Sequence, residues 1–444
     1  MDASSYFRGK KITVMGLGLL GGVGDIAYLA ESGADLIVTD LKKEEDAKPS
    51  LDALRAFPNI KYTLGRHELE DFRDRDLILK APSTPVDSIF IAEARKQNIP
   101  ITMWAALFAG FAREAGALLV GVTGTRGKST VTEMLVAILR ANGTPVIEGG
   151  NVQGSSLLSQ LSNLTPDTVV VLELDSWKLQ GFGEAKISPQ IAVFTTLYAD
   201  HMNYYRDDMG AYLADKANIF LNQSADDTLI VGKQCAATII EKYGEQIESR
   251  VQIVDELKLP DTWTLCIPGM HNRYDAALAL AAARALGVDD TVSRSALTSF
   301  AGVPGRLELI REVEGIKVYN DTTSTTPEAT LVALSALRQS SGQNQNLILI
   351  LGGADKGLDM SALIAKLPET KRVILLAGSG TERIKDQVSG ASIYGSIAEA
   401  VADAFVHAEK GDIILLSPAF ASFGMFKNEY DRGEQFDALV KEYE

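Results

Sequence analysis

The sequence is poor in cysteine, with Cys235 and Cys266 the two thiols among 444 residues. Two cysteines are too few for a disulfide framework or a cysteine-rich zinc site, and they fit a reducing compartment. Long apolar runs are lacking too: the longest candidate, residues 104–112, predicts a buried helix because it is too short to span a bilayer. The apolar stretch near the start is Gly-rich and predicts a strand rather than a signal peptide. We therefore expect a cytoplasmic protein without membrane insertion.

Basic residues are outnumbered, with 43 Lys and Arg against 58 Asp and Glu and a formal net charge of -15. Such a chain is a poor candidate for binding nucleic acid. An anionic ligand must instead be held by local features such as helix N-termini, Gly-rich loops and a few placed cations. The length and the 46% hydrophobic content allow about three domains.

Strand and helix patterns alternate along almost the whole chain, which predicts an α/β protein with parallel sheets. Three domains are expected, over residues 1–114, 115–306 and 307–444, with a hinge near 302–306 and a polar loop over 339–346. Helices are expected over 25–32, 131–140 and 212–220. The expected strands cover residues 11–15, 35–39, 118–122, 168–172, 191–195, 228–231, 347–351, 373–376 and 412–416.

The first Gly-rich loop contains Gly16, Gly18 and Gly21 between an expected strand and an expected helix, and Asp40 ends the next strand. This spacing is typical of the dinucleotide-binding βαβ unit, in which an acidic residue contacts a ribose. Glycines let the backbone approach a phosphate, and the helix N-terminus supplies N–H donors. The pattern does not distinguish NAD, FAD or another nucleotide, and a tight turn without a ligand is the alternative.

A second phosphate loop follows the strand expected at 118–122 and leads into a helix. It resembles a P-loop but departs from the strict spacing, because Val122 stands where the first glycine would be. In such a loop the backbone N–H groups surround the phosphates, the lysine reaches the β- and γ-phosphates, and the serine meets Mg²⁺. A chance turn is the alternative. The expected ATP-binding residues here are Gly124, Thr125, Arg126, Gly127, Lys128, Ser129 and Thr130.

Glu173 follows an apolar strand in the same block. A carboxylate at the end of a buried strand beside a P-loop is placed like a Mg²⁺ ligand, and Mg²⁺ needs more oxygen ligands than one serine hydroxyl. A solvated strand end is the alternative. Two phosphate loops in one chain favour two nucleotide-like ligands, one held and one hydrolysed.

Motifs spread over all three blocks resemble those of the Mur ligase family, and within it the MurD type. The loop Gly-Thr-Arg-Gly-Lys-Ser is that family's own form of the P-loop. The other matching motifs are Glu148-Gly149-Gly150-Asn151, Glu173-Leu174-Asp175-Ser176, Tyr198-Ala199-Asp200-His201, Lys216, Gly269-Met270-His271-Asn272, Gly302-Val303-Pro304-Gly305-Arg306, Tyr319-Asn320-Asp321, Gly352-Gly353-Ala354-Asp355-Lys356, Leu416-Ser417-Pro418, Ser422, Phe426-Lys427-Asn428 and Arg432-Gly433.

The resemblance implies three domains: a Rossmann-like domain that binds UDP, a central P-loop ATPase domain, and a Rossmann-like C-terminal domain that binds the amino acid. It implies the ATP-dependent addition of D-glutamate to UDP-N-acetylmuramoyl-L-alanine in peptidoglycan precursor synthesis, by a monomer. A carboxylate is a poor electrophile, so ATP first converts it to an acyl phosphate, which the amine then attacks. Both transition states gather negative charge, so catalysis depends on Mg²⁺ and cationic side chains.

The resemblance also assigns roles to individual residues. The expected catalytic residues are Lys128, His201, Lys216 and Lys356. Two Mg²⁺ ions are expected, with ligands from Ser129, Glu173, His201 and a carbamylated Lys216. ATP is expected to contact Asn272, Arg306 and Asp321 besides the P-loop. The UDP-substrate residues are Gly16, Gly18, Leu19, Gly21, Asp40, Ser83 and Asn151, and the incoming glutamate is expected to contact Thr325, Lys356 and Ser422.

Four places in the sequence depart from the usual MurD pattern. Thr323 replaces a lysine, Glu429 replaces a phenylalanine, Lys178 replaces a glutamine, and Ala81-Pro82-Ser83 stands for Ser-Pro-Gly. These changes affect the expected identity and stereochemistry of the amino-acid substrate, and none of them lies among the residues expected for phosphoryl transfer. A related ligase for L-glutamate, another amino acid or a folate-type acceptor therefore stays open. An NAD-dependent oxidoreductase and a P-loop ATPase without ligase activity are more distant alternatives, because they leave Glu173 or Lys356 unexplained.

Overall fold

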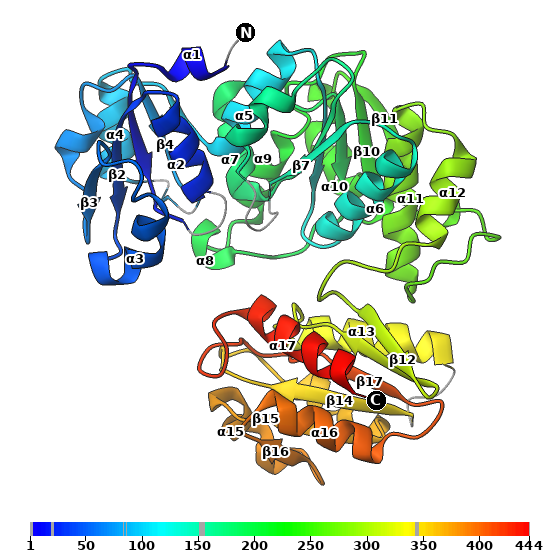
Figure 1. Cartoon of the computed structure of the whole chain (residues 1–444). Coiled ribbons are helices and arrows are strands. Elements are labelled where there is room, and N and C mark those ends of the chain that lie inside the picture. The colour runs from blue at the N-terminus through cyan, green and yellow to red at the C-terminus, as the bar shows by residue number, and fades with distance from the viewer. Residues whose placement is uncertain are drawn as a thin grey trace. The chain divides into compact units, whose positions relative to one another are not determined.

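The computed structural model contains three β-sheets flanked by helices (Figure 1). It describes residues 3–18, 22–82, 84–85, 87–150, 156–341 and 346–443. Contacts divide the chain into two compact units, Met1–Pro260 with Tyr274–Ala296, and Asp261–Arg273 with Leu297–Glu444. Each expected block contains one sheet, and the first two sheets lie in one unit. No helix in the described ranges is both long and apolar enough to cross a bilayer.

The first sheet is parallel, with the order β3-β2-β1-β4-β5. Its strands end at one edge, where the first Gly-rich loop follows β1. The strands are β1 (Lys11–Met15), β2 (Asp35–Asp40), β3 (Lys61–Leu64), β4 (Leu77–Leu79) and β5 (Ile101–Thr102). The accompanying helices are α1 (Ala3–Phe7), α2 (Gly22–Glu31), α3 (Glu44–Ala53), η1 (Leu69–Phe72), α4 (Ile89–Lys96) and α5 (Trp104–Glu114).

The second sheet is also parallel, with the order β11-β10-β9-β6-β8-β7. Every residue of β8 and β9 is buried, as expected for central strands covered by helices on both faces. The strands are β6 (Leu118–Thr123), β7 (Val146–Gly149), β8 (Val169–Glu173), β9 (Ile191–Phe194), β10 (Thr228–Gly232) and β11 (Arg250–Val254). The helices are α6 (Lys128–Ala141), η2 (Leu158–Asn163), α7 (Ser176–Ala185), α8 (Met202–Tyr205), α9 (Met209–Ala217), α10 (Lys233–Tyr243), η3 (Gly244–Gln246), η4 (Glu256–Lys258), α11 (Met270–Ala285) and α12 (Asp290–Thr298).

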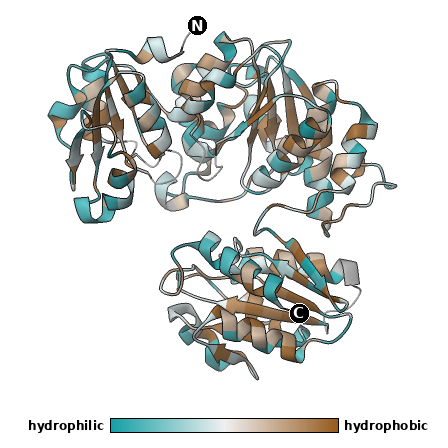
Figure 2. Cartoon of the chain, viewed as in Figure 1, coloured by the Kyte–Doolittle hydropathy of each residue, from teal (hydrophilic) through white to brown (hydrophobic). Residues whose placement is uncertain are grey.

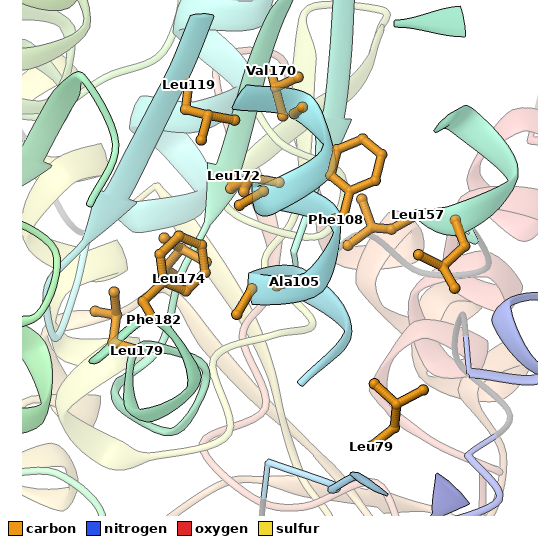
Figure 3. Close-up of a cluster of buried hydrophobic side chains, with 14 of the residues drawn as sticks. Leu79, Ala105, Phe108, Leu119, Leu157, Val170, Leu172, Leu174, Leu179 and Phe182 are labelled. Atoms are coloured by element: carbon orange, nitrogen blue, oxygen red, sulfur yellow. The ribbon is translucent and has the colours of Figure 1, made fainter. Parts of the chain in front are cut away.

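One hydrophobic cluster runs through both sheets of the first unit, from Phe7 to Tyr243. Figure 3 shows part of it, with Phe108 of α5 beside the strand residues Val170 and Leu172. Helix α5 contacts β6, α7 and η2, all of which belong to the second sheet's surroundings. The first two blocks therefore share one hydrophobic core, and the side chains of α5 are buried between them.

The third sheet has the order β12-β13-β17-β14-β15-β16, and it is mixed rather than wholly parallel. The expectation of parallel strands is wrong for β12, which pairs antiparallel with β13 across a tight turn. The strands are β12 (Glu308–Val313), β13 (Ile316–Asn320), β14 (Leu347–Gly352), β15 (Arg372–Leu376), β16 (Ser392–Tyr394) and β17 (Ile413–Leu416). The helices are α13 (Pro327–Ser341), α14 (Ser361–Ile364), η5 (Leu367–Glu369), α15 (Ser379–Ile384), η6 (Lys385–Gln387), α16 (Ile397–His407) and α17 (Glu429–Glu442).

Apolar residues concentrate on the central strands of each sheet (Figure 2). In the third sheet they form one cluster on each face, and both clusters lie wholly within the second unit. All nine strands expected from the sequence are confirmed to within one residue at either end. Four expectations were wrong in extent. Helix α13 continues to Ser341 where a loop was expected from 339, and α9 lies at Met209–Ala217 rather than 212–220. Helices α2 and α6 begin at Gly22 and Lys128, three residues before the expected 25 and 131.

Candidate active site

The P-loop lies at the carboxyl edge of the second sheet, between β6 and α6. Strand register places Val122 beside Glu173 of β8 and Thr123 beside Phe194 of β9. In a parallel sheet all strands end at the same edge, and the turns that follow them meet there. The sequence therefore brings the P-loop, Glu173 and the segment after β9 to one edge of the sheet.

The P-loop backbone requires glycine at two positions. Gly127 has φ +85° and is the N-cap of α6, and Gly124 has φ +143°. A Cβ at Gly124 would overlap the Thr195 hydroxyl, and one at Gly127 would lie 2.5 Å from an Asp275 carboxylate oxygen. The loop is fixed to the end of β9, because the Thr125 N–H donates to the Thr196 carbonyl at 2.7 Å. Ser129 and Thr130 lie in the first turn of α6, where backbone N–H groups are available to an anion.

Two lysines converge on the carbonyl of Gly124. Lys128 Nζ donates to Gly124 O and Thr125 O at 3.1 Å each. Lys216 Nζ, from α9, donates to Gly124 O at 2.9 Å and to the Thr123 hydroxyl at 3.4 Å. The Lys216 residue is 1% exposed. Burial, together with the nearby charge of Lys128, lowers the pKa of Lys216 to about 7, although Asp175, Asp200 and Glu173 act in the opposite direction.

Glu173 is the last residue of β8 and is buried. Gly150 directly follows β7 and has φ +103°. It packs on the backbone of Glu173, because a Cβ at Gly150 would overlap the Glu173 carbonyl oxygen. The expected substrate residue Asn151 follows Gly150 but lies outside the described residues. Glu148, in β7, is also nearby, and burial and the neighbouring Glu133 raise its pKa to about 7.

His201 precedes the short helix α8 and has φ +55°. Its ring lies 4.4 Å from that of Trp177, between centroids, and its Nε2 lies 3.5 Å from a carboxylate oxygen of Asp200. Trp177 belongs to the first turn of α7. Lys178, the cation that replaces a glutamine, forms an ion pair with Asp175 at 2.5 Å. Burial tends to raise the pKa of Asp175, but this pairing outweighs it, and the pKa lies below its ordinary value.

The expected metal ligands include oxygen donors of the type that Mg²⁺ binds, but they do not form a complete protein site. Glu173 offers a carboxylate and Ser129 a hydroxyl, both oxygen donors of the kind that Mg²⁺ prefers. Within the described residues no group of three or more His, Cys, Asp or Glu side chains is arranged to hold a metal ion. This donor set fits an ion that is bound chiefly through nucleotide phosphates, with the protein supplying one or two ligands.

Two of the expected ATP residues come together in the second unit. Asp321 is buried at the end of β13 and accepts hydrogen bonds from the Ser417 hydroxyl at 2.7 Å and the Leu307 N–H at 3.1 Å. Burial raises the pKa of Asp321 to about 6, although Arg306 acts to lower it. Arg306 itself is exposed. Asn272 lies in the first turn of α11, where its amide donates to the Pro268 carbonyl at 2.6 Å.

The expected amino-acid residues also lie close together. Lys356 Nζ donates to the Thr325 hydroxyl at 2.8 Å. Ser422 is buried and follows Ala421, which pairs with Ala354 two residues before Lys356. Partial burial lowers the pKa of Lys356, with Glu429 acting against this shift. Glu429 thus lies near a cation of this site, whereas the hydroxyl of Thr323 donates to the Gly305 carbonyl at 2.9 Å.

In the first sheet the glycine loop and Asp40 meet as expected. The Leu17 N–H donates to Asp40 Oδ2 at 2.6 Å, and the Lys42 N–H donates to Oδ1 at 2.8 Å. Gly16 has φ +105°, and a Cβ there would lie 3.1 Å from Ala81, while the space around Gly18 is open. The other expected residues of this site, Leu19, Gly21 and Ser83, lie outside the described residues.

Three residues of these sites were assigned no role from the sequence, although Arg432 belongs to one of the matching motifs. Asp275 of α11 fills the space beside Gly127. Tyr212 of α9 pairs with the Thr125 hydroxyl at 3.2 Å, and its ring lies 4.9 Å from Lys216 Nζ. Arg432 is fully buried and donates to Thr322 and the Phe420 carbonyl, so it links the loops that carry Thr325 and Ser422. An arginine at 0% exposure is unusual, but no sequence pattern around Arg432 predicts its burial.

Family models match all three blocks. A MurD-like N-terminal domain of Mur ligases covers residues 10–103, a Mur ligase middle domain covers 122–258, and a Mur ligase glutamate ligase domain covers 305–420. The chain belongs to the Mur ligase family. Among Mur ligases it is 36% identical to a UDP-N-acetylmuramoylalanine--D-glutamate ligase of Roseiflexus sp. (strain RS-1), over 98% of this chain and 99% of that protein. An enzyme of the same name from Borreliella burgdorferi is 34% identical over 96% of both chains.

Solved Mur ligases have the same fold. The UDP-N-acetylmuramate-alanine ligase MurC of Thermotoga maritima aligns with a TM-score of 0.60 at 18% identity, over 97% of this chain and 99% of that one. MurF ligase of the same organism, in complex with ADP, aligns with a TM-score of 0.59 at 17% identity over the full length of both chains. At such low identity these structures support the three-domain α/β architecture and nothing finer.

Proposed function

We propose that the chain is an ATP-dependent ligase that joins D-glutamate to UDP-N-acetylmuramoyl-L-alanine in the cytoplasmic synthesis of peptidoglycan precursors. The observation that carries the proposal is the convergence of Lys128 and the buried Lys216 on the P-loop carbonyl of Gly124, beside Glu173. Full-length similarity to enzymes named for this reaction supports the choice of substrates. The protein is expected to act as a monomer on small-molecule substrates.

In the first step the acceptor carboxylate attacks the γ-phosphorus of ATP, forming an acyl phosphate and releasing ADP. The N–H groups of residues 124–130 and the ammonium of Lys128 stabilise the charge on the transferred phosphoryl group. In the second step the neutral amine of glutamate attacks the acyl carbon. The tetrahedral intermediate then expels phosphate, and the amide nitrogen loses a proton. The enzyme supplies position and positive charge and forms no covalent bond to the substrate.

Two Mg²⁺ ions are proposed, the first held by Ser129 and Glu173, and the second by His201 and a carbamylated Lys216. When bound, they neutralise the charge of the phosphates and of the attacking carboxylate. The environment of Lys216 supports carbamylation, because a buried amine with a pKa of about 7 is neutral in a substantial fraction of molecules near neutral pH, and the neutral amine can react with CO₂. The product is an anionic oxygen donor, whereas a bare ammonium would repel a cation.

Substrate contacts are proposed for three further groups of residues. Asn272 contacts the adenine, Asp321 the ribose and Arg306 the γ-phosphate. Lys356, Thr325 and Ser422 hold the carboxylates of the incoming amino acid, and the 2.8 Å bond between Lys356 and Thr325 supports their joint action. The UDP part of the acceptor is proposed to contact Gly16, Gly18, Leu19, Gly21, Asp40, Ser83 and Asn151.

The test is phosphate release from ATP and Mg²⁺ in the presence of UDP-N-acetylmuramoyl-L-alanine, with D-glutamate and L-glutamate supplied separately. Release that requires the acceptor and D-glutamate is the expected result. Release with L-glutamate or another amino acid alone would keep the mechanism but assign the altered specificity to Thr323 and Glu429. Absence of release with every amino acid would reject the ligase with this acceptor.

A further inference from the structure

Helix α7 runs from the ATP side of the first unit to the N-terminal sheet. Its N-cap, Asp175, lies two residues after Glu173. Its buried face contributes Leu179 and Phe182 to the core shared by both sheets (Figure 3). Gln180 and Glu184 lie four residues apart and therefore lie on one face of the helix. The polar contacts of these two side chains reach the loop that follows β4.

Glu184 fixes the beginning of that loop. Its carboxylate oxygen lies 3.3 Å from Lys80 Nζ and 2.9 Å from Arg95 Nη2. Lys80 directly follows β4, and its side chain is 8% exposed. A buried ammonium is costly without an anionic partner, so this pair holds Lys80 against α7.

Gln180 contacts the same loop through Tyr204 of α8. The Gln180 amide donates to the Tyr204 hydroxyl at 3.2 Å and to Asp215 Oδ2 at 2.8 Å, which uses both of its hydrogens. The Tyr204 hydroxyl in turn donates to the Thr84 carbonyl at 3.3 Å. Lys80 and Thr84 are thus both linked to α7, and Ser83, an expected UDP-substrate residue, lies between them in the sequence.

The other end of this network borders the ATP site. Asp215 immediately precedes Lys216 in α9 and also accepts a hydrogen bond from the Tyr205 hydroxyl at 2.9 Å. Tyr204 and Tyr205 belong to α8, which begins directly after His201. Trp177 of α7 packs against both His201 and Tyr204, with ring centroids 4.4 Å and 5.5 Å apart. One set of side chains therefore contacts the loop after β4 and flanks Lys216 and His201.

We propose that Gln180 and Tyr204 are positioning residues that fix the loop after β4, through Thr84, relative to the ATP-binding edge of the second sheet. The inference rests on the proposed function, in which the acceptor is bound at the first sheet and ATP at the second. The acceptor carboxylate must meet the γ-phosphorus in line with the leaving ADP. A displacement of about 1 Å can cost about 100-fold in rate, so the link between the two binding regions controls the phosphoryl-transfer step.

The experiment compares wild type, Gln180→Ala, Tyr204→Phe and the double variant in steady-state phosphate release. The values measured are kcat, KM for ATP and for the acceptor, Kd for a non-hydrolysable ATP analogue, and Tm. Tyr204→Phe removes the hydroxyl but keeps the ring that packs against Trp177. It therefore serves as the reference variant if Gln180→Ala lowers Tm. Tyr62→Phe, the same chemical change on the exposed strand β3, is the matched control.

The expected result is a decrease in kcat of about 10- to 100-fold for each single variant. KM for ATP and Kd for the analogue should stay within about twofold of wild type, because the P-loop is untouched. The double variant should be no slower than the slower single variant, because both changes break the same link. If the two residues served folding alone, the variants would lower Tm and would not combine a lower kcat with an unchanged KM for ATP.

Three outcomes would overturn the proposal. They are a Tyr204→Phe variant with wild-type kcat, a parallel rise in KM for ATP, and effects of the two changes that multiply in the double variant. A wild-type protein that releases no phosphate with any amino acid would instead reject the proposed function. If the wild type is active and Tyr204→Phe has the same kcat, the positioning role is rejected and the proposed function stands.

Discussion

Burial gives Lys216 a pKa of about 7, so its amine is neutral at a pH where an exposed lysine is charged. The neutral amine is the form that reacts with CO₂, so carbamylation should increase as pH rises through 7. We predict a carbamate signal in the ¹³C NMR spectrum of the enzyme in ¹³C-bicarbonate, and its loss in Lys216→Met. Activity should fall in CO₂-depleted buffer and return when bicarbonate is added. A signal that persists in Lys216→Met would place the carbamate on another amine.

Asp25 of α2 is a second residue whose burial has a measurable consequence. Its carboxylate accepts hydrogen bonds from the Ser156 hydroxyl at 2.6 Å and the Leu158 N–H at 2.8 Å. Burial nonetheless raises the pKa of Asp25 from 3.8 to about 6. The folded protein therefore binds this proton more tightly than the unfolded chain, and the contribution of Asp25 to stability falls as pH rises from about 4 to about 6.

We predict that Asp25→Asn removes this part of the pH dependence. The raised pKa means that the free energy of unfolding is about 3 kcal/mol lower when Asp25 is ionised than when it is protonated. Urea unfolding at several pH values between 4 and 8 would measure it, with Asp52→Asn on the surface of α3 as the control. An unchanged slope of unfolding free energy against pH in Asp25→Asn would contradict the prediction.

Among the elements, the turn after β7 depends on a single glycine. Gly150 combines φ +103° with direct packing on the backbone of Glu173. Gly143, in the turn after α6, has φ +73° but open space around it, so Gly143→Ala tests the cost of the backbone conformation alone. We predict that Gly143→Ala loses about 1 to 2 kcal/mol of stability with unchanged activity. Gly150→Ala should displace Glu173 and lose activity as well, as phosphate release would measure.

The sequence predicted elements that have a strong local pattern. The nine expected strands are apolar runs that lie inside their sheets. Of the missed strands, β3, β7 and β12 lie at sheet edges and carry polar residues, whereas β4 is internal and apolar but only three residues long. The antiparallel pairing of β12 depends on the turn at Glu314 and Gly315, for which the alternating pattern offered no signal.

The candidate site divides in a similar way. The P-loop and Glu173 follow from glycine spacing and from the end of an apolar strand. His201 and Lys216 were expected from the family resemblance alone, since a single histidine or lysine has no informative pattern. The properties that matter for Lys216 are its burial and its bond to Gly124, and both arise from packing of α9 on the sheet. Long-range contacts such as Gln180 with Asp215 are likewise invisible in the sequence.

At the scale of the whole molecule, the hydrophobic clusters indicate which parts can fold alone. The clusters on both faces of the third sheet lie within Leu297–Glu444. In contrast, α5 ends the first block but contacts β6, α7 and η2 of the second. A chain cut at residue 114 would therefore expose the face of α5 that contains Ala105, Phe108 and Ala112, all buried in the intact protein.

We predict that the fragment 297–444 unfolds cooperatively, with a clear Tm by circular dichroism. The fragment 1–114 should unfold at lower temperature or aggregate, because burial of one phenylalanine side chain alone contributes about 2 to 3 kcal/mol. The fragment 1–296 restores the partners of α5 and is the matched control. Cooperative unfolding of 1–114 at the midpoint of 1–296 would contradict the prediction. Such a result would mean that the shared hydrophobic core adds little to the stability of the first sheet. The contacts of Gln180 and Tyr204 would then have to hold the two sheets in place without help from this core.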